Sequence, residues 1–239
     1  MAAKYFSVKL LKVKKASVVS FDISALYNRI MTNSALATQI AAAEVTLAIQ
    51  DTKLGALIAA QAPLNRLRKG DYFANLVRSI ISQQVSVAAS RAILARVQAA
   101  TGLEPKRILA LNPEELRALG LSRPKAGYIS DLAEHFVREP GIFDHLERLA
   151  DDEVITELTR IKGIGAWTAQ MFLMFTLGRL DIFAPDDVGL QRAITRLYGL
   201  KEVPSRTQLE ALAEAWRPYR TVASWHLWES LTHEPYHTT

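Results

Sequence analysis

Hydrophobic residues recur at intervals of three and four along most of the chain, the spacing that places them on one face of a helix. From residue 32 onward, this pattern predicts helices over 33–50, 54–60, 72–81, 85–101, 113–119, 123–138, 143–149, 151–160, 166–177, 186–198, 206–216 and 219–232. Asn112 and Pro113 supply an N-cap and a first-turn proline, and Gly102 and Gly199 stand where helices should stop. The pattern therefore predicts an all-α fold.

Residues 1–30 differ from the rest, because lysines alternate there with β-branched and other apolar residues. They are consistent with a short β element, a flexible basic arm, or extra sequence before a start at Met31. They lack the arrangement of a secretory signal. Six Lys and Arg residues against one Asp give this leader a net charge of +5, which is the charge of the whole chain. The remaining residues sum to zero, so their net charge gives no argument for nucleic-acid binding.

The amino-acid composition excludes several kinds of functional site. The 239 residues include no cysteine, which excludes disulfides, cysteine-ligated zinc and four-cysteine iron–sulfur clusters. The five histidines lack metal-ligand spacing, so no catalytic metal is expected. Hydrophobic residues at 49% and charged residues at 22% are ordinary for a globular protein, and no long uncharged apolar run suggests a membrane span. We expect an intracellular monomer.

The segment 158–169 predicts a helix, a hairpin containing Gly163 and Gly165, and a second helix that begins near Ala166. Glycines at these two positions allow a positive φ and a close approach of the backbone to a ligand. The amides of the turn and of the new helix N-terminus then point the same way and form an anion site. Because the chain has no phosphate loop of nucleotide-binding type, a nucleic-acid phosphate is the expected anion.

A pair of carboxylates, Asp186 and Asp187, follows Pro185 at a predicted helix start, and Asp187 lies 22 residues after Gly165. Capping alone explains many such pairs, because Asp is favoured at the N-cap and in the first turn. Downstream of a phosphate-binding hairpin, a carboxylate suggests chemistry beside the nucleic-acid backbone.

These motifs resemble those of the helix-hairpin-helix (HhH-GPD) DNA glycosylases. The family hairpin, Leu-Pro-Gly-hydrophobic-Gly-x-x-Thr-Ala, is similar to residues 161–169, with Lys162 in place of the proline. Residues 80–86 (IISQQVS) resemble the loop that fills the gap left by an extruded base. The runs 216–220 (WRPYR) and 225–228 (WHLW) are similar to the alkylpurine, or 3-methyladenine, glycosylase II branch. The resemblance covers about residues 60 to 232.

The resemblance implies two helical lobes with the active-site cleft between them. Residues 71–181 would form one lobe, and 31–70 with 182–239 would form the other. Residues 1–30 would be a basic leader, extended or a small β element. The branch sometimes carries a sizeable N-terminal β domain, which we expect to be absent here or reduced to residues 1–30.

The resemblance also assigns roles. Asp187 would be the catalytic carboxylate and Asp186 the helix cap. A helix N-terminus favours a negative charge, which suits stabilisation of an oxocarbenium-like sugar. Trp167 stands where strand-cleaving relatives carry a nucleophilic lysine, so the resemblance implies hydrolysis without lyase activity. Lys162, with the hairpin residues Gly163, Gly165 and Thr168, would bind DNA phosphates.

The base pocket would include Trp167, Trp228 and Met171, although packing in the core is an equally simple role for the tryptophans. Gln84, with Gln83 beside it, would enter the base stack after the target nucleotide flips. The alternative is that both are ordinary polar residues at the start of a helix. No cofactor is expected, apart from a monovalent cation that the hairpin carbonyls could hold by resemblance.

The function that the resemblance implies is that of a monofunctional DNA glycosylase. Its partner would be double-stranded DNA with damaged bases, and its substrates alkylated purines of the 3-methyladenine and 7-methylguanine type. Base flipping and excision would initiate base excision repair. Two alternatives stay open: a glycosylase for a deaminated or oxidised base, and a helix-hairpin-helix protein that binds DNA without catalysis.

Overall fold

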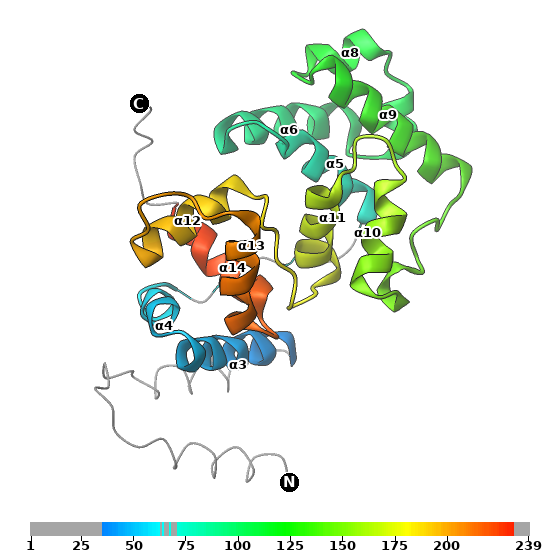
Figure 1. Ribbon diagram of the computed structural model, residues 1–239. Coiled ribbons are helices and arrows are strands. Elements are labelled where there is room, and N and C mark those ends of the chain that lie inside the picture. Colours follow the sequence, from blue (N-terminus) through cyan, green and yellow to red (C-terminus); the bar gives the residue numbers. More distant parts are fainter. Residues whose placement is uncertain (1–34, 63, 65–66, 68–70, 232–239) are drawn as a thin grey trace, which may run out of the picture.

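The computed structural model describes residues 35–62, 64, 67 and 71–231 of the chain, and over these residues it contains helices and no strand (Figure 1). The all-α prediction is confirmed for this part, whereas the leader 1–30 lies outside the described residues. The helices are α3 (Ala35–Gln50), α4 (Thr52–Ala59), α5 (Tyr72–Ser82), α6 (Val87–Thr101), α7 (Pro105–Leu109), α8 (Pro113–Ala118), α9 (Arg123–Arg138), η1 (Leu146–Arg148), α10 (Asp151–Thr159), α11 (Ala166–Phe172), η2 (Leu173–Leu177), α12 (Val188–Tyr198), α13 (Arg206–Ala213), η3 (Glu214–Trp216) and α14 (Arg220–Glu229).

Three short elements differ from the expected pattern. The helix predicted over 143–149 is a series of turns with one 3₁₀ segment, η1. Helix α7 was not predicted, because its five residues are too few to show a hydrophobic period. The helix predicted over 166–177 continues from α11 as the π-helix η2 and ends at Gly178, whose φ is 72°.

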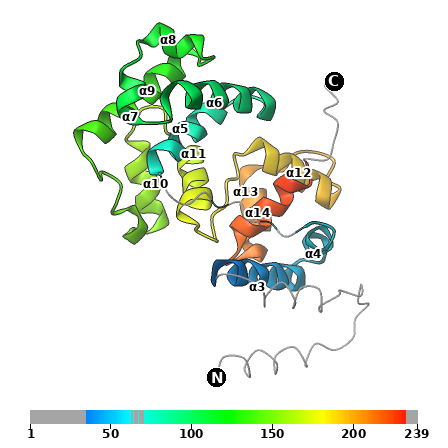
Figure 2. The ribbon, with the colours of Figure 1, turned by 180° about the vertical axis from the view of Figure 1, so that it is seen from behind.

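The helices pack in two groups (Figures 1 and 2). Helices α5 to α11 form one group, in which α5 contacts α9 and α11, and α10 contacts α11. The other group joins α3 and α4 to α12 and α14, although these pairs are far apart in the sequence. The division of the whole chain at residue 181, and the assignment of the leader, stay predictions.

Each group is held by buried aliphatic and aromatic side chains. On α5, Leu76, Val77 and Ile80 are fully buried, and on α9 Ile129 and Leu132 are as well. Burial of one such side chain contributes roughly 1.5–3 kcal/mol relative to exposure. None of the described helices is long and apolar enough to cross a bilayer.

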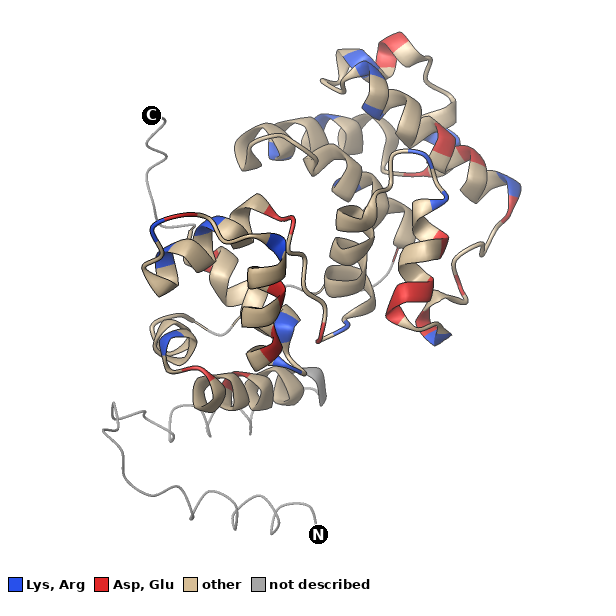
Figure 3. Ribbon diagram, in the orientation of Figure 1, with Lys and Arg blue, Asp and Glu red and all other residues tan. Residues whose placement is uncertain are grey.

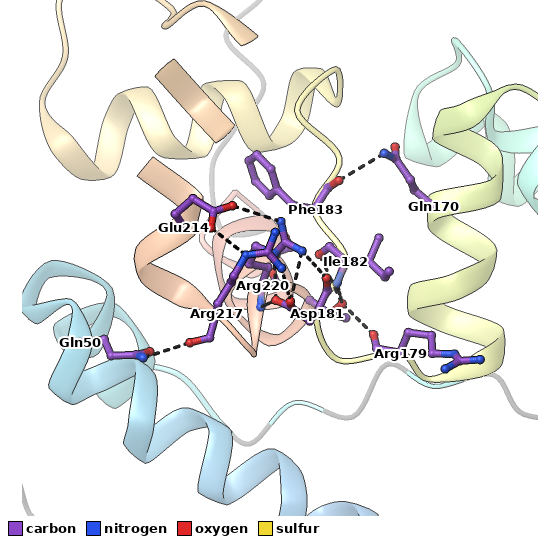
Figure 4. A network of polar contacts seen from close by, with 11 residues as sticks. Gln50, Gln170, Arg179, Asp181, Ile182, Phe183, Glu214, Arg217 and Arg220 are labelled. Carbon is purple, nitrogen blue, oxygen red and sulfur yellow. Dashed lines mark hydrogen bonds and ion pairs between the residues drawn. The ribbon is translucent and has the colours of Figure 1, made fainter. Parts of the chain in front are cut away.

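The chain passes between the two groups through residues 179–183, which are fastened to the start of α14 (Figure 4). Arg220 donates hydrogen bonds to the Asp181 carboxylate (2.8 Å) and to the Asp181 carbonyl oxygen (2.8 Å). The buried Thr221 hydroxyl donates to the Arg179 carbonyl (2.7 Å) and accepts from the Ile182 amide (3.0 Å). The WRPYR run therefore anchors the segment that leads to the Asp186–Asp187 pair.

Candidate active site

Asp187 is the N-cap of α12, and its carboxylate accepts three N–H hydrogen bonds. One oxygen, Oδ1, accepts from the Leu190 amide (2.7 Å) and from Trp228 Nε1 (2.9 Å). The other, Oδ2, accepts from Trp167 Nε1 (2.8 Å). The donors are the positive ends of N–H dipoles, so together they orient and stabilise a negatively charged carboxylate.

The carboxylate lies where the two helix groups meet. Trp167 is in the first turn of α11, in one group. Asp187, which precedes α12, and Trp228, which lies on α14, belong to the other group. Gln170 of α11 also donates to the Phe183 carbonyl (3.2 Å) across the same junction (Figure 4). The sequence places these residues far apart, and the packing of the two groups brings them together.

Asp186 does not cap the helix, so that part of the sequence-based assignment is wrong. A turn closed by the Asp187 amide on the Ala184 carbonyl (3.0 Å) delays the helix start to Val188, which makes Asp187 the cap. The Asp186 carboxylate forms an ion pair with Arg206 (2.7 Å), and both side chains are about 60% exposed. Asp187 therefore combines the capping role with the contacts to the indoles.

The four tryptophans divide into two kinds. Trp216 and Trp225 are fully buried and belong to the core. Trp167 and Trp228 are half-buried, and both of their N–H groups bind Asp187. The Trp228 ring also packs on Phe175, with 5.7 Å between ring centroids.

Two further residues are relevant to this site. Met171 is 7% exposed, one helical turn after Trp167, and its place in a base pocket stays a prediction. Gly189 was missed by the sequence analysis: a Cβ there would lie 3.0 Å from Asp187 Oδ1 and 3.2 Å from Trp228 Cδ1. A glycine two residues after the Asp pair was the available signal, and it allows the indole to approach the carboxylate.

The hairpin between α10 and α11 uses its two glycines differently. Gly163 has a φ of +86°, and a Cβ there would lie 2.2 Å from Tyr128 Cγ of α9. Gly165 has a φ of −93° and open space around its Cβ position, so the expectation of a positive φ is wrong for this residue. Gly165 is instead the N-cap of α11, where the first-turn amides have no intrahelical partners. Lys162 is exposed beside them.

Thr168 points inward. Its side chain is 1% exposed, and its hydroxyl accepts a hydrogen bond from Gln83 Nε2 (2.9 Å). The backbone amide of Thr168 is the group left to contact a phosphate, and its phosphate-binding role stays a prediction.

The two glutamines between α5 and α6 also have separate positions. Gln84 is exposed and has a φ of 52°, which is uncommon for a residue other than glycine. The Gln83 side chain binds the hairpin, at the Gly163 carbonyl (2.9 Å) as well as at Thr168. The hairpin thus holds the Gln83 side chain in this structure, and its assignment as part of the wedge stays a prediction.

The described residues form a cavity away from Asp187, and they form no metal site. A cavity of about 720 Å³ is lined by residues that include Asp71, Tyr72, Asp144, Glu147 and Arg179, and by none of the residues that surround Asp187. Among the described residues, no group of three or more His, Asp or Glu side chains is arranged to hold a metal ion.

Comparison with known proteins agrees with this geometry. Residues 77–218, from α5 through η3, match the model of the HhH-GPD superfamily of base excision DNA repair proteins. The chain belongs to this superfamily. The matched residues include the loop at Gln84, the hairpin, Trp167 and Asp187, whereas Trp228 follows the matched part.

Several HhH-GPD relatives are similar over most of their length. The chain is 31% identical to the alkylbase DNA glycosidase-like protein mag2 of Schizosaccharomyces pombe, over 78% of this chain and 92% of the relative. The solved 3-methyladenine DNA glycosylase Mag1 of the same yeast, in complex with abasic DNA, has a TM-score of 0.72 and 31% identity, and the match covers 79% of this chain and 95% of that one. The DNA-3-methyladenine glycosidase of Bacillus halodurans has a TM-score of 0.65 and 40% identity, over 78% and 88% of the two chains.

Proposed function

We propose that this protein is a monofunctional DNA glycosylase. It hydrolyses the N-glycosidic bond of alkylated purines, of the 3-methyladenine and 7-methylguanine type, in duplex DNA, and so initiates base excision repair. The observation that carries the proposal is the Asp187 carboxylate, held by two indole N–H groups beside the hairpin of an HhH-GPD protein. The names of the relatives support the choice of lesion.

Cleavage of the glycosidic bond of such a base requires little general-acid catalysis. Alkylation at N3 or N7 gives the purine a positive charge, so the base departs with the electron pair of the C1′–N bond and becomes neutral. The sugar develops oxocarbenium character, which the Asp187 carboxylate stabilises electrostatically. A water molecule then bonds to C1′ and loses a proton to solvent.

Trp167 and Trp228 supply the faces for a cationic base. An electron-rich aromatic ring attracts a cation, and the attraction grows when the pair is removed from water. Both rings are half-buried next to Asp187, so an extruded base at this position would meet them before its bond breaks. A neutral purine would gain less, which favours alkylated bases.

Trp167 also determines the reaction class. It lies in the first turn of α11, and an indole cannot form a Schiff base with the sugar. Water is then the final nucleophile, and the strand remains intact at the abasic site.

The hairpin and the loop before α6 position the DNA in this proposal. The first-turn amides of α11 and the exposed Lys162 would bind phosphates, and Gln84 would fill the gap left by the flipped base. The protein would act in a compartment that contains DNA.

A monovalent cation at the hairpin is a further part of the proposal. The Ile161 carbonyl accepts from the Ile164 amide (3.1 Å), and the Gly163 carbonyl accepts from Gln83 (2.9 Å). Each carbonyl oxygen has a second lone pair, so these bonds leave acceptor capacity for a cation. Replacement of potassium by a bulky organic cation at constant ionic strength should then weaken DNA binding.

The decisive experiment measures release of free base from methylated duplex DNA. Incubation with the protein should release 3-methyladenine and 7-methylguanine, detected by chromatography, without strand breaks before alkali treatment. Release of uracil or 8-oxoguanine alone would assign another lesion. DNA binding without release of any base would indicate a non-catalytic module, and strand cleavage before alkali would contradict the assignment of a simple hydrolase.

A further inference from the structure

A lysine from α9 fastens the loop between α5 and α6 at its base. The last carbonyls of a helix have no intrahelical donor. Lys125, in the first turn of α9, donates from Nζ to the carbonyl oxygens of Ile81 (2.8 Å) and Gln83 (2.6 Å). Its ammonium group also faces the negative end of the α5 dipole. Burial lowers the pKa of Lys125, because the ammonium group loses part of its hydration.

A second fastening ties the same loop to the hairpin. Gln83 Nε2 donates to the Gly163 carbonyl (2.9 Å) and to the Thr168 hydroxyl (2.9 Å), so both amide hydrogens are engaged. Tyr128 of α9 lies against Gly163 on the same hairpin. The loop, the hairpin and α9 are therefore linked through side chains.

Gln84 lies between the hydrogen-bonded Gln83 and the start of α6. The carbonyl and side chain of Gln83 are held on one side, and Ser86 caps α6 on the other, where its hydroxyl accepts from the Ala89 amide (3.2 Å). Between Gln83 and the capped start of α6, Gln84 takes the left-handed conformation and its side chain is exposed. The fastenings thus account for a backbone conformation that glutamine rarely adopts.

We propose that Lys125 and Gln83 are positioning residues for base extrusion: they hold Gln84 ready to fill the gap and set its place relative to the phosphate-binding hairpin. The proposal rests on the proposed glycosylase function. A wedge already in its final conformation loses little conformational entropy when it enters the stack. Base extrusion, and not bond cleavage, is therefore the step that these residues favour.

The test compares two alkylated duplexes in single-turnover reactions at saturating enzyme. In one, the lesion faces a normal base; in the other, it faces an abasic-site analogue, so that less pairing opposes extrusion. Lys125→Met should slow excision from the paired duplex by about tenfold or more, since a hydrogen bond to a charged group contributes at least about 1.5 kcal/mol. Gln83→Met removes two neutral hydrogen bonds and should slow excision from this duplex by about fivefold or more. The loss on the second duplex should be clearly smaller. Lys125→Arg should recover part of the rate, and Lys106→Met, at an exposed lysine of α7, should equal the unmodified protein.

Equal losses on the two duplexes, or no loss, would overturn the proposal, because a merely structural role does not distinguish them. Fluorescence of 2-aminopurine placed beside an abasic-site analogue measures loop insertion without chemistry. If the unmodified protein releases no base, the glycosylase proposal fails. The fluorescence change on binding, and its loss in Lys125→Met, would still support the role of the loop, whereas an unchanged signal in that variant would refute it.

Discussion

A single carboxylate, that of Asp187, has both a structural role and the central role in the proposed chemistry. Asp187 begins α12 through its bond to the Leu190 amide, and the same side chain receives the indoles of Trp167 and Trp228. A side chain fixed by three donors has little freedom to move as a sugar approaches. This preorganisation is what electrostatic stabilisation of a developing positive charge requires.

Replacement of Asp187 by Asn separates charge from shape. The variant keeps the side-chain volume and a capping oxygen, but its amide group places N–H donors against an indole N–H. We expect base release to fall by about a hundredfold or more, which is typical for removal of one preorganised electrostatic group. Affinity for a duplex with an abasic-site analogue should survive, as measured by fluorescence anisotropy.

Asp186→Asn is the matched control for this change. It loses only the exposed ion pair with Arg206, worth at most about 1 kcal/mol. Excision should remain within about fivefold of the unmodified protein. If Asp186→Asn abolished release and Asp187→Asn did not, the roles within the pair would be interchanged.

Trp228→Phe tests the hydrogen bond apart from the aromatic face. Loss of a donor to a carboxylate costs roughly 1.5–3 kcal/mol, so kcat should fall about ten- to a hundredfold, while affinity for alkylated DNA changes less. Trp225→Phe is the control on the same helix. The Trp225 N–H finds no partner among the described residues, so this change should leave kcat intact. The smaller ring leaves space in the core and should lower the melting temperature. Similar kcat losses in both variants would show that packing, not the bond to Asp187, is responsible.

At the scale of elements, the local parts of the fold could be predicted from the sequence. The helical period identified most of the long helices, and the glycine spacing identified the hairpin, because both signals depend on neighbouring residues. The residue at which a helix begins was harder to predict. Asp186 and Asp187 have the same intrinsic capping preference, and only the turn from Ala184 decides which of them caps α12.

The site itself could be predicted only in part, because several of its bonds are long-range. Gln83 reaches partners 80 and 85 residues away, and no local pattern distinguishes it from Gln84 as a wedge. Likewise, the sequence could not show which tryptophans are core and which bind Asp187, since indoles on one helix differ only in what the packing places beside them. Resemblance to a family supplied positions that periodicity alone did not.

The hairpin provides a test of an element through its two glycines. Gly163→Ala forces a Cβ into the Tyr128 ring at a φ of +86°, and the backbone conformation alone costs about 1 kcal/mol or more. Affinity for damaged and undamaged duplex should fall together, because phosphate contacts carry no base information. Gly165→Ala, at a negative φ with open space, should be much milder. Loss of affinity for damaged DNA alone would assign the hairpin to the base pocket.

A second element-scale interaction joins α4 to α12 and η3 through Asp51. Its carboxylate caps α4 and also accepts from the Tyr198 hydroxyl and from Trp216 Nε1 (3.0 Å). Burial raises the pKa of Asp51, but the hydrogen bonds from Tyr198, Leu54, Trp216 and Lys53 outweigh it, so the net pKa lies below its ordinary value.

A pKa lowered by folding means that this stabilisation is fully present above the unfolded-state pKa, about 3.9, and is lost as the pH falls through the folded-state value. Asp51→Asn retains a cap but loses the charge. We expect it to reduce the free energy of unfolding at pH 7 by about 1 kcal/mol, a figure that allows for partial exposure. Urea denaturation between pH 7 and pH 2 should show this difference shrinking below about pH 4. A difference independent of pH would exclude the carboxylate charge as its source.

At the scale of the whole molecule, the site exists only while the two helix groups are in contact. Trp167 comes from one group, and Trp228 with Asp187 comes from the other. Arg217 and Arg220 of the WRPYR run, with Thr221 after it, bind the connecting segment that leads to Asp187 (Figure 4). Acidic and basic residues are distributed over both groups (Figure 3), which is why the proposed phosphate binding is assigned to the local dipoles of the hairpin.

The leader supplies charge that the rest of the chain lacks, since residues 1–30 carry six Lys and Arg against one Asp, a net of +5 that equals the total. A protein that starts at Met31 should therefore bind undamaged duplex more weakly and with less salt dependence. Each lost phosphate contact should reduce the slope of log affinity against log salt by about 0.9. Single-turnover excision at saturating enzyme should stay close to the full-length rate, because Asp187 and its partners remain. A lower melting temperature with an unchanged slope would instead indicate a structural role for the leader. If neither quantity changed, the leader would have neither role.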